Sequence, residues 1–457
     1  MKTNKTKKPI NINNVLSVTN PYAAGIDIGD TEHFVAISDG KGGHEVKCYK
    51  AFTEDLRLIV QYLQEEGITT VAIESTGVYW LQLYLMLEEA GIEPYLVNAK
   101  HVKNVTGRKK DDSDAIWIQK LHTCGLLQKS FQPEGEIRVL RTYTRQRKNL
   151  ITISSDAVRR MQKALELMNI KIHTVISDLL GKTGMQMLQA ILAGEREPAT
   201  LAKLTDPRIK AKEEDILKSL EGIWKDEYLF MLQQSYDEYC FYQRQIQNCE
   251  EKIKEQLLKH VAIVKEGDIS GLDARESVPS GEVKLKKKRK KNQFSFAVAP
   301  FLKEMTGVDL CKIPGIKEAT AIEFISEIGT DMSNWKSAKH FAAWLNLAPN
   351  TKITGGKIIS SKIPKKKNKA GQCLKMAAFT LLRNKTPIGD FYRRQRAKSG
   401  GKGAALSTAH KLSRIIYTML KDKREYNPEI LHKTQKKYKE QRIMQLEKQL
   451  AWLKKAA

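Results

Sequence analysis

Four acidic residues stand where an apolar run ends or a helix would begin, so their carboxylates could meet at one place. Asp27 lies inside an apolar run that ends in glycine, and Glu74 ends a second run. Asp111 and Asp114 are three residues apart, so on a helix they share one face. A buried strand acid costs several kcal/mol unless a cation or hydrogen bonds compensate it. Because carboxylates suit paired Mg²⁺ ions that activate phosphate displacement, we predict a Mg²⁺ site here, with Mn²⁺ as a substitute.

Each of these acids also has a purely structural explanation. Asp111, Asp112 and Asp114 suit the first turn of a helix, where the helix dipole stabilises negative charge. Asp112 would point about 100° away from its neighbour and away from any shared ion. Glu74 could simply be a solvated acid at a strand end. The order of all four acids on a basic chain favours the metal site.

The charge of the chain predicts a polyanionic partner. Its 457 residues include 78 Lys and Arg against 52 Asp and Glu, which leaves a net charge of +26. Nucleic acid is the first expectation and an anionic membrane surface the second. No apolar run approaches the roughly 20 residues of a membrane span, so we expect no membrane partner. The hydrophobic content of 41% excludes wholesale disorder.

The cysteines and the N-terminus place the chain in a reducing compartment. None of the six cysteines forms a C-x-x-C pair, which argues against a disulfide framework and against a zinc knuckle. Residues 1–22 hold four lysines, no acid and no apolar segment, unlike a secretory signal.

Several basic segments are candidates for phosphate contacts. Seven of the eight residues of 284–291 are basic, so this run should self-repel until it meets phosphates. Five lysines fall within 362–369. Residues 391–403 combine arginines, aromatic residues and glycines, so this stretch is expected to be basic and flexible. A solvated basic helix face is the alternative for the last segment. The expected nucleic-acid contacts are Lys286, Lys287, Lys288, Arg289, Lys290, Lys291, Lys357, Lys365, Lys366, Lys367, Arg393, Arg394 and Arg396.

A glycine turn adds one more candidate contact. Residues 311–317 (CKIPGIK) precede a predicted helix and resemble a helix-hairpin-helix turn. In such a turn Gly315 would let backbone N–H groups approach a phosphate. A plain loop is the alternative.

The elements that must position the acids form an α/β domain over 23–130. Three strand signals are followed by strand–helix alternation, which indicates a mixed sheet. A further helix is expected to start near Asp111 or Asp112. The strands are expected at 23–29, 34–38, 45–49, 71–74 and 94–97, and two helices at 53–66 and 78–90.

Beyond this domain the pattern is helical. Apolar residues recur at helical spacing within 158–168 and within 246–257. Two long helices packed as an antiparallel coiled-coil-like arm are therefore expected over 137–264, with ordinary helix packing as the alternative. The remaining expected parts are a basic N-terminal tail at 1–22, a helical insertion near 175–230, a Lys-rich linker at 267–292, a mainly α domain at 294–420 and a basic helical tail at 421–457.

The three acidic motifs resemble those of a known family. Residues 25–29 (GIDIG), 73–79 (IESTGVY) and 109–115 (KKDDSDA) are similar to motifs of the DEDD, RuvC-like insertion-sequence transposases related to the Piv DNA invertases. Lys110 stands where that family usually has threonine. The resemblance implies an RNase H-like (RuvC-like) domain. It also implies catalytic and metal-binding roles for Asp27, Glu74, Asp111 and Asp114.

The C-terminal half resembles the second domain of the same family. There a Gly-Leu-x-Pro turn leads to a Ser-Gly dipeptide, and the serine joins to the DNA backbone through a phosphoester. Residues 344–357 (WLNLAPNTKITGGK) have this form, with Thr354 at the serine position. Ser360 and Ser361 are nearby alternatives. Thr354 could also be a turn residue that bonds its own backbone.

The resemblance implies an insertion-sequence transposase acting as a site-specific recombinase on double-stranded DNA. It would cleave and rejoin strands with Mg²⁺ through a covalent hydroxyl-phosphoester intermediate. The group implied is guided by a structured non-coding (bridge) RNA. It acts as a homo-oligomer (dimer or tetramer) in the bacterial cytoplasm, associated with the nucleoid. Two alternatives remain: a RuvC-like nuclease or junction resolvase without a covalent intermediate, and a non-catalytic nucleic-acid-binding derivative.

Overall fold

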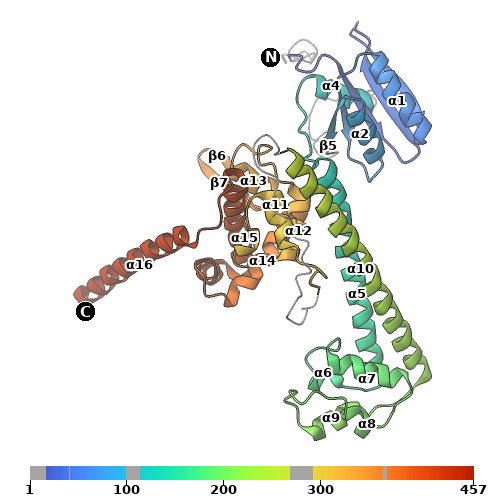
Figure 1. The fold of residues 1–457 in the computed structure, drawn as a ribbon. Helices are drawn as coiled ribbons and strands as arrows, with labels where there is room; N and C mark the ends of the chain where they lie inside the picture. The colour runs from blue at the N-terminus through green and yellow to red at the C-terminus, as the bar shows by residue number, and fades with distance from the viewer. Residues whose placement is uncertain (1–16, 41, 99–113, 268–291, 364–367, 457) are drawn as a thin grey trace, which may run out of the picture. The chain divides into compact units, whose positions relative to one another are not determined.

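The computed structural model describes residues 17–40, 42–98, 114–267, 292–363 and 368–456. The chain divides into two compact units, residues 1–132 and 133–457. Figure 1 shows both. No helix within the described ranges is long and apolar enough to cross a membrane.

The first unit contains a five-stranded sheet in the order β3-β2-β1-β4-β5, with antiparallel pairing from β1 to β3 and parallel pairing among β1, β4 and β5. This confirms the mixed α/β sheet predicted from the sequence. Its strands are β1 (Ala23–Ile28), β2 (Glu32–Ser38), β3 (His44–Lys50), β4 (Thr70–Glu74) and β5 (Glu93–Val97). Its helices are α1 (Thr53–Glu65), α2 (Trp80–Glu89) and α4 (Asp114–Thr123).

Both faces of the sheet are covered, which explains why its central strands are apolar throughout. On one face, alternate residues such as Ile26 and Ile73 share a core with Ile59 of α1 and Leu83 of α2. On the other face, Ala72 packs with Val97 of β5 and with three α4 residues, Trp117, Ile118 and Leu121. Side chains alternate along a strand, so odd-numbered positions of β1 face α4.

Helix α4 lies unusually close to β1 because Gly25 has no side chain. A Cβ at Gly25 would stand 2.5 Å from the Ala115 carbonyl oxygen and 2.3 Å from the Gln119 nitrogen, both backbone atoms. The Gln119 side chain donates to the Ala23 carbonyl (3.2 Å) and hydrogen-bonds His44 (3.0 Å). Glycine at this point therefore fixes how near the start of α4 comes to the end of β1.

The second unit begins with two long antiparallel helices, α5 (Gly135–Leu167) and α10 (Asp226–Gly267), seen side by side in Figure 1. Later residues of one helix contact earlier residues of the other: Arg147 bonds Glu250, and Ser154 bonds Gln243. The two long helices of the predicted arm are present. Their packing as a true coiled coil remains a prediction.

The two apolar stripes do not face each other. The stripe at 158–168 joins a core that includes Leu188 of the insertion and Leu232 of α10. In the stripe at 246–257, Cys249 contacts the carbonyl of Tyr143, near the opposite end of α5. Each apolar stripe therefore packs near a different end of the helix pair. The insertion comprises α6 (Ile172–Val175), α7 (Lys182–Leu192), α8 (Pro198–Ala202) and α9 (Glu213–Leu220).

The rest of the second unit is mainly helical, as predicted, but it also contains a β-hairpin where only loops were expected. Buried aromatic residues lie in the core of this helical part, where the ring centroids of Trp335 and Phe341 are 4.9 Å apart. The elements are α11 (Ala299–Thr306), η2 (Leu310–Lys312), α12 (Glu318–Ile328), α13 (Ala338–Trp344), β6 (Asn350–Thr354), β7 (Lys357–Lys362), α14 (Lys369–Phe379), η3 (Thr380–Arg383), α15 (Pro387–Asp422) and α16 (Pro428–Ala456).

A buried ion pair joins the long helices to this helical part. Arg147 (3% exposed) and Glu250 (0% exposed) bond at 2.7 Å. The Arg147 guanidinium also donates to the Asn292 carbonyl and lies 3.7 Å from the Phe294 ring centroid. Glu250 accepts from the Ser295 backbone N–H. Each charged group therefore has a further hydrogen-bond partner besides the other, as a buried ion pair requires.

Candidate active site

The parallel pairing of β1 and β4 brings Asp27 and Glu74 to one edge of the sheet. Ile26 lies opposite Ile73, and the two acids are the next residue of each strand. Neighbouring strands lie about 4.8 Å apart. Ile26 and Ile73 belong to the core on the other face, so both acids face the α4 side. The sequence prediction that these two acids share a strand-end edge agrees with this register.

The two acids have different surroundings. Asp27 is half-buried, whereas Glu74 is 8% exposed. The Thr76 hydroxyl donates to the Glu74 carboxylate at 3.3 Å, and the Ser75 N–H donates to the Val97 carbonyl at 2.8 Å. The turn after β4 therefore keeps the strand in the sheet up to its last residue and holds the Glu74 side chain.

The start of α4 adds the third acid on the same face. Asp114 is the first residue of α4, and the next residue, Ala115, has its carbonyl against Gly25. Gly25 and Asp27 lie on the same face of β1 because they are two residues apart. Close helix–strand contact thus ties the position of Asp114 to the strand that carries Asp27.

The fourth acid, Asp111, and its neighbour Asp112 lie outside the described residues. Within those ranges no three His, Cys, Asp or Glu side chains are grouped closely enough to hold a metal ion. The hard oxygen donors of Asp27, Glu74 and Asp114 fit Mg²⁺ or Mn²⁺ in type. The four-acid metal site remains a prediction whose completion depends on the segment before α4.

One buried histidine near the acids was not singled out from the sequence. His33 of β2 pairs with Ile28 in the sheet and is 1% exposed. Burial lowers its pKa, and the charge of Asp27 opposes that shift. The apolar alternation of 33, 35 and 37 marks it as a core position, and this was the available signal. Its side chain lies on the same face of the sheet as that of Ile28, its partner in β1, and not on the face of Asp27.

Thr354 ends β6 at the tip of the exposed β6–β7 hairpin. Its partner across the hairpin is Lys357. Gly355 and Gly356 both have positive φ (55° and 74°), as a type I′ turn requires. The turn therefore presents the Thr354 hydroxyl and the Lys357 ammonium next to each other in solvent. The two alternative hydroxyls, those of Ser360 and Ser361, lie further from the tip of the hairpin, where Ser360 pairs with Lys352.

The other predicted nucleic-acid contacts fall in three groups. The run Lys286 to Lys291 and the lysines 365–367 lie outside the described residues. Arg393 donates to the carbonyls of Leu382 and Asn384, so its guanidinium already holds the start of α15. Arg394 and Arg396 lie on α15, which is helical on both sides of a break at Gly400. The stretch expected to be flexible is thus mostly helix.

Gly315 has a packing reason to be glycine. Its φ is +89°, and a Cβ there would stand 3.0 Å from the Ala377 carbonyl oxygen. The close neighbour is therefore α14, and its role towards a phosphate stays a prediction.

Comparison with family models gives two matches. A model described as a transposase, of the DEDD IS110 group, matches residues 24–170, and a model described as transposase IS116/IS110/IS902 family matches residues 309–393. The first range contains all four acids, and the second contains Gly315, the β6–β7 hairpin and Arg393. No curated protein matches the chain.

Proposed function

The chain belongs to the IS110 family of DEDD transposases, and on this premise we propose that it is an insertion-sequence recombinase whose catalytic acids are Asp27, Glu74, Asp111 and Asp114. Membership in a transposase family makes it a DNA-processing protein. Cleavage, rejoining and their chemistry belong to this proposal.

One observation carries the assignment of the acids. The β1–β4 register places Asp27 and Glu74 side by side on the α4 face, and the Gly25 contact holds the start of α4 against β1. Strand-end carboxylates facing one helix start are an arrangement that binds divalent ions. A bound Mg²⁺ would supply positive charge to a scissile phosphate. The acids would hold the ion, and the Thr76 hydroxyl, which donates to the Glu74 carboxylate, would orient that side chain.

The proposed nucleophile is the Thr354 hydroxyl. Its oxygen would form a bond to phosphorus while the bond from phosphorus to a deoxyribose oxygen breaks, and that oxygen would leave with the proton. Rejoining would be the same exchange with another strand's hydroxyl. The hairpin tip supports this role because it exposes the hydroxyl and places Lys357 across the turn, where an ammonium can pair with a phosphate.

Further parts of the proposal go beyond what family membership shows. We propose double-stranded DNA as substrate, a structured non-coding RNA as guide, and a homo-oligomer, dimer or tetramer, as the active form. The net charge of +26 supports a large polyanionic ligand.

A metal-dependent nuclease without a covalent intermediate is the second candidate. The acids lie in the first unit and Thr354 in the second, so hydrolysis would need only the first. Trapping separates the two functions. Full-length protein is incubated with Mg²⁺, with DNA carrying its insertion-sequence ends and with RNA transcribed from the DNA that flanks its gene, then denatured and digested with nuclease. We expect a nucleotide-linked peptide containing Thr354.

Three variants sharpen this test. Thr354→Ser should keep the adduct because it removes only a methyl group, whereas Thr354→Ala should lose it while still binding DNA. Linkage to Ser360 or Ser361 would contradict the nucleophile assignment. Cleavage by Thr354→Ala without any adduct in wild type would establish the nuclease, and no Mg²⁺-dependent cleavage by wild type would indicate a non-catalytic derivative.

A further inference from the structure

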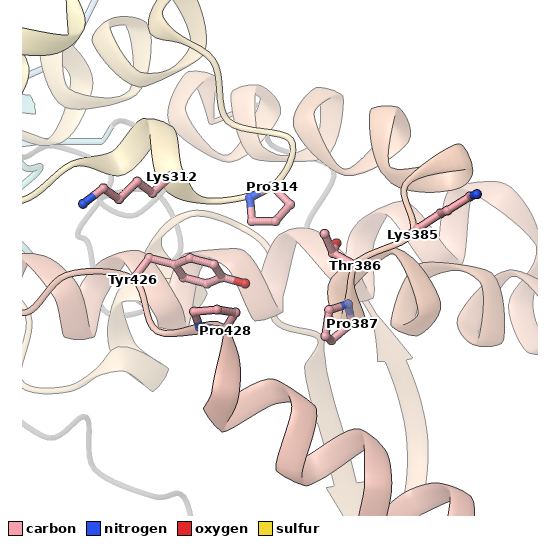
Figure 2. A pocket seen from close by; sticks show the side chains of 7 residues that line it. All are labelled: Lys312, Pro314, Lys385, Thr386, Pro387, Tyr426 and Pro428. Atoms are coloured by element: carbon pink, nitrogen blue, oxygen red, sulfur yellow. The ribbon is translucent and has the colours of Figure 1, made fainter.

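A small pocket in the second unit lies where three chain segments meet: the turn after η2, the start of α15 and the start of α16. Figure 2 shows the side chains that line it. The cavity measures about 460 Å³, which falls within the usual range for small-ligand sites, roughly 300–1,000 Å³. Its lining residues are Lys312, Pro314, Lys385, Thr386, Pro387, Tyr426 and Pro428.

Two hydroxyl groups in the pocket wall are buried and unpaired. Neither Tyr426 Oη nor Thr386 Oγ1 has a hydrogen-bond partner among the described residues. Thr386 occupies the N-cap position of α15, yet its side chain makes no capping bond. In Figure 2 the Tyr426 hydroxyl points into the space among Pro314, Thr386 and Pro428. Burial raises the pKa of Tyr426, so its phenol keeps the proton and can donate.

The rest of the pocket divides into an apolar interior and a basic rim. Three proline rings and the Tyr426 ring provide flat apolar surfaces inside. Lys312 and Lys385 lie on opposite sides, and their ammonium groups extend outward in Figure 2. None of the described residues that line the cavity is acidic. Lys312 also forms a half-exposed ion pair with Glu425 at 3.3 Å, so Lys385 is the less engaged of the two cations.

We propose that this pocket binds one unpaired nucleotide of a nucleic-acid strand. The base would pack against Tyr426 and the prolines, its polar edge would bond the two buried hydroxyls, and Lys312 and Lys385 would contact the flanking phosphates. A duplex does not fit, because its bases are stacked inside and cannot reach hydroxyls at the bottom of a cavity. This proposal rests on the proposed function, in which DNA is the substrate and RNA the guide. Either of them could offer an unpaired nucleotide.

Photocrosslinking of the full-length protein tests the location. The probes are 15-nucleotide single strands with one central 5-iodouracil, made as DNA and as RNA, and the same DNA strand annealed to its complement. We expect a crosslinked peptide containing Tyr426 from a single-stranded probe and none from the duplex. The relative yields from DNA and RNA identify which strand the pocket takes. Crosslinks that omit Tyr426, or that form equally with the duplex, would overturn the proposal.

Substitutions test the energetics on the same probes. Tyr426→Phe removes only an unpaired hydroxyl, so the fold should persist. Its affinity for the single strand should fall about five- to tenfold, the factor expected for one hydrogen bond. Tyr22→Phe, at an exposed tyrosine of the first unit, is the matched control and should change nothing. Lys385→Ser should reduce the salt dependence of binding by about one unit of slope. Unchanged affinity of Tyr426→Phe would refute the pocket.

Failure of this proposal differs from failure of the recombinase assignment. Mg²⁺-dependent cleavage without a Tyr426 crosslink would leave the recombinase and remove the pocket. A Tyr426 crosslink from protein that never cleaves DNA would leave the pocket in a non-catalytic derivative.

Discussion

At the scale of single residues, position decides which acids can act together. Asp27 and Glu74 occupy the same register point on adjacent parallel strands, and Asp114 opens the helix on that face. In the sequence, the three-residue spacing of Asp111 and Asp114 predicted that they share one face of a helix. Asp112 does not have this spacing and is expected to point away from that face. Asp114 and Asp112 therefore allow a proposed site carboxylate to be compared with a neighbouring carboxylate of the same type.

Removing one of the carboxylates proposed to bind the metal should abolish strand cleavage. Asp114→Asn keeps the size and the helix start but loses a charge that balances the ion and the phosphate, so we expect a cleavage rate at least about a hundredfold lower. Asp112→Asn is the matched control and should retain most activity. The measurement is single-turnover cleavage in Mg²⁺, with EDTA as a blank. Equal rates for the two variants would contradict the site.

A second residue-scale prediction concerns the buried ion pair. Arg147→Ala leaves the Glu250 charge uncompensated in a site where both residues are at most 3% exposed. Loss of one partner of such a pair costs about 3–5 kcal/mol. Arg145→Ala breaks the more exposed pair with Glu327 and should cost less than about 1 kcal/mol.

Hydrogen exchange of the α10 amides around Glu250 measures these losses locally. A matched double change, Arg147→Met with Glu250→Leu, should recover much of the protection because no charge stays buried. Equal losses for the Arg147 and Arg145 variants would show that burial does not set the difference.

At the scale of elements, the sequence predicted the sheet well and the second unit less well. The five strands lie within about two residues of their expected bounds because apolar runs and glycines mark them. The β6–β7 hairpin was missed although Gly355 and Gly356 between β-branched residues are a hairpin signal. Glycines at 400, 401 and 403 suggested flexibility, yet α15 is helical on both sides of Gly400, with buried residues such as Tyr392 before it and Ala404 after it. The order of the acids in the sequence predicted a shared site, which stays a prediction, whereas the close contact at Gly25 needed the structure.

The contact between α4 and β1 should be essential for cleavage. Gly25→Ala places a Cβ against two backbone atoms of α4, which cannot rotate away, so α4 and Asp114 must move. We expect destabilisation of about 1–3 kcal/mol and loss of cleavage with the sheet retained. Gly91→Ala, where a Cβ meets no atom within 4 Å, controls for glycine replacement at a strained position. Circular dichroism melting and cleavage assays compare them. Full cleavage by Gly25→Ala would exclude the positioning role.

At the scale of the whole molecule, charge governs general affinity for nucleic acid. The excess is unevenly spread: residues 24–170 are close to neutral, whereas residues 309–393 hold 15 basic against 6 acidic residues. The Lys-rich run 284–291, which is defined here by sequence alone, adds seven basic residues. A run of like charges without aromatic residues contacts phosphates and carries no base-specific information.

Replacing the seven basic residues of 284–291 by serine should weaken binding to all sequences alike. Each lost cation should flatten the plot of log affinity against log salt by about 0.7–0.9. Fluorescence anisotropy with cognate and scrambled DNA over a salt series gives both quantities. Replacing the exposed, uncharged Gln247 and Asn248 of α10 by serine provides a control without charge change. A selective loss on cognate DNA would show that this run reads bases.

The antiparallel pairing of α5 and α10 also constrains how the protein can change length. Arg147 meets Glu250 and Ser154 meets Gln243, so each step of seven residues along one helix matches seven along the other. An insertion in only one helix would rotate its buried side away from its partner. Matched insertions or deletions of seven residues in both would preserve every face and shift the end of the pair by about 10 Å. The length of this arm can therefore change without disturbing its packing only when α5 and α10 gain or lose the same number of residues.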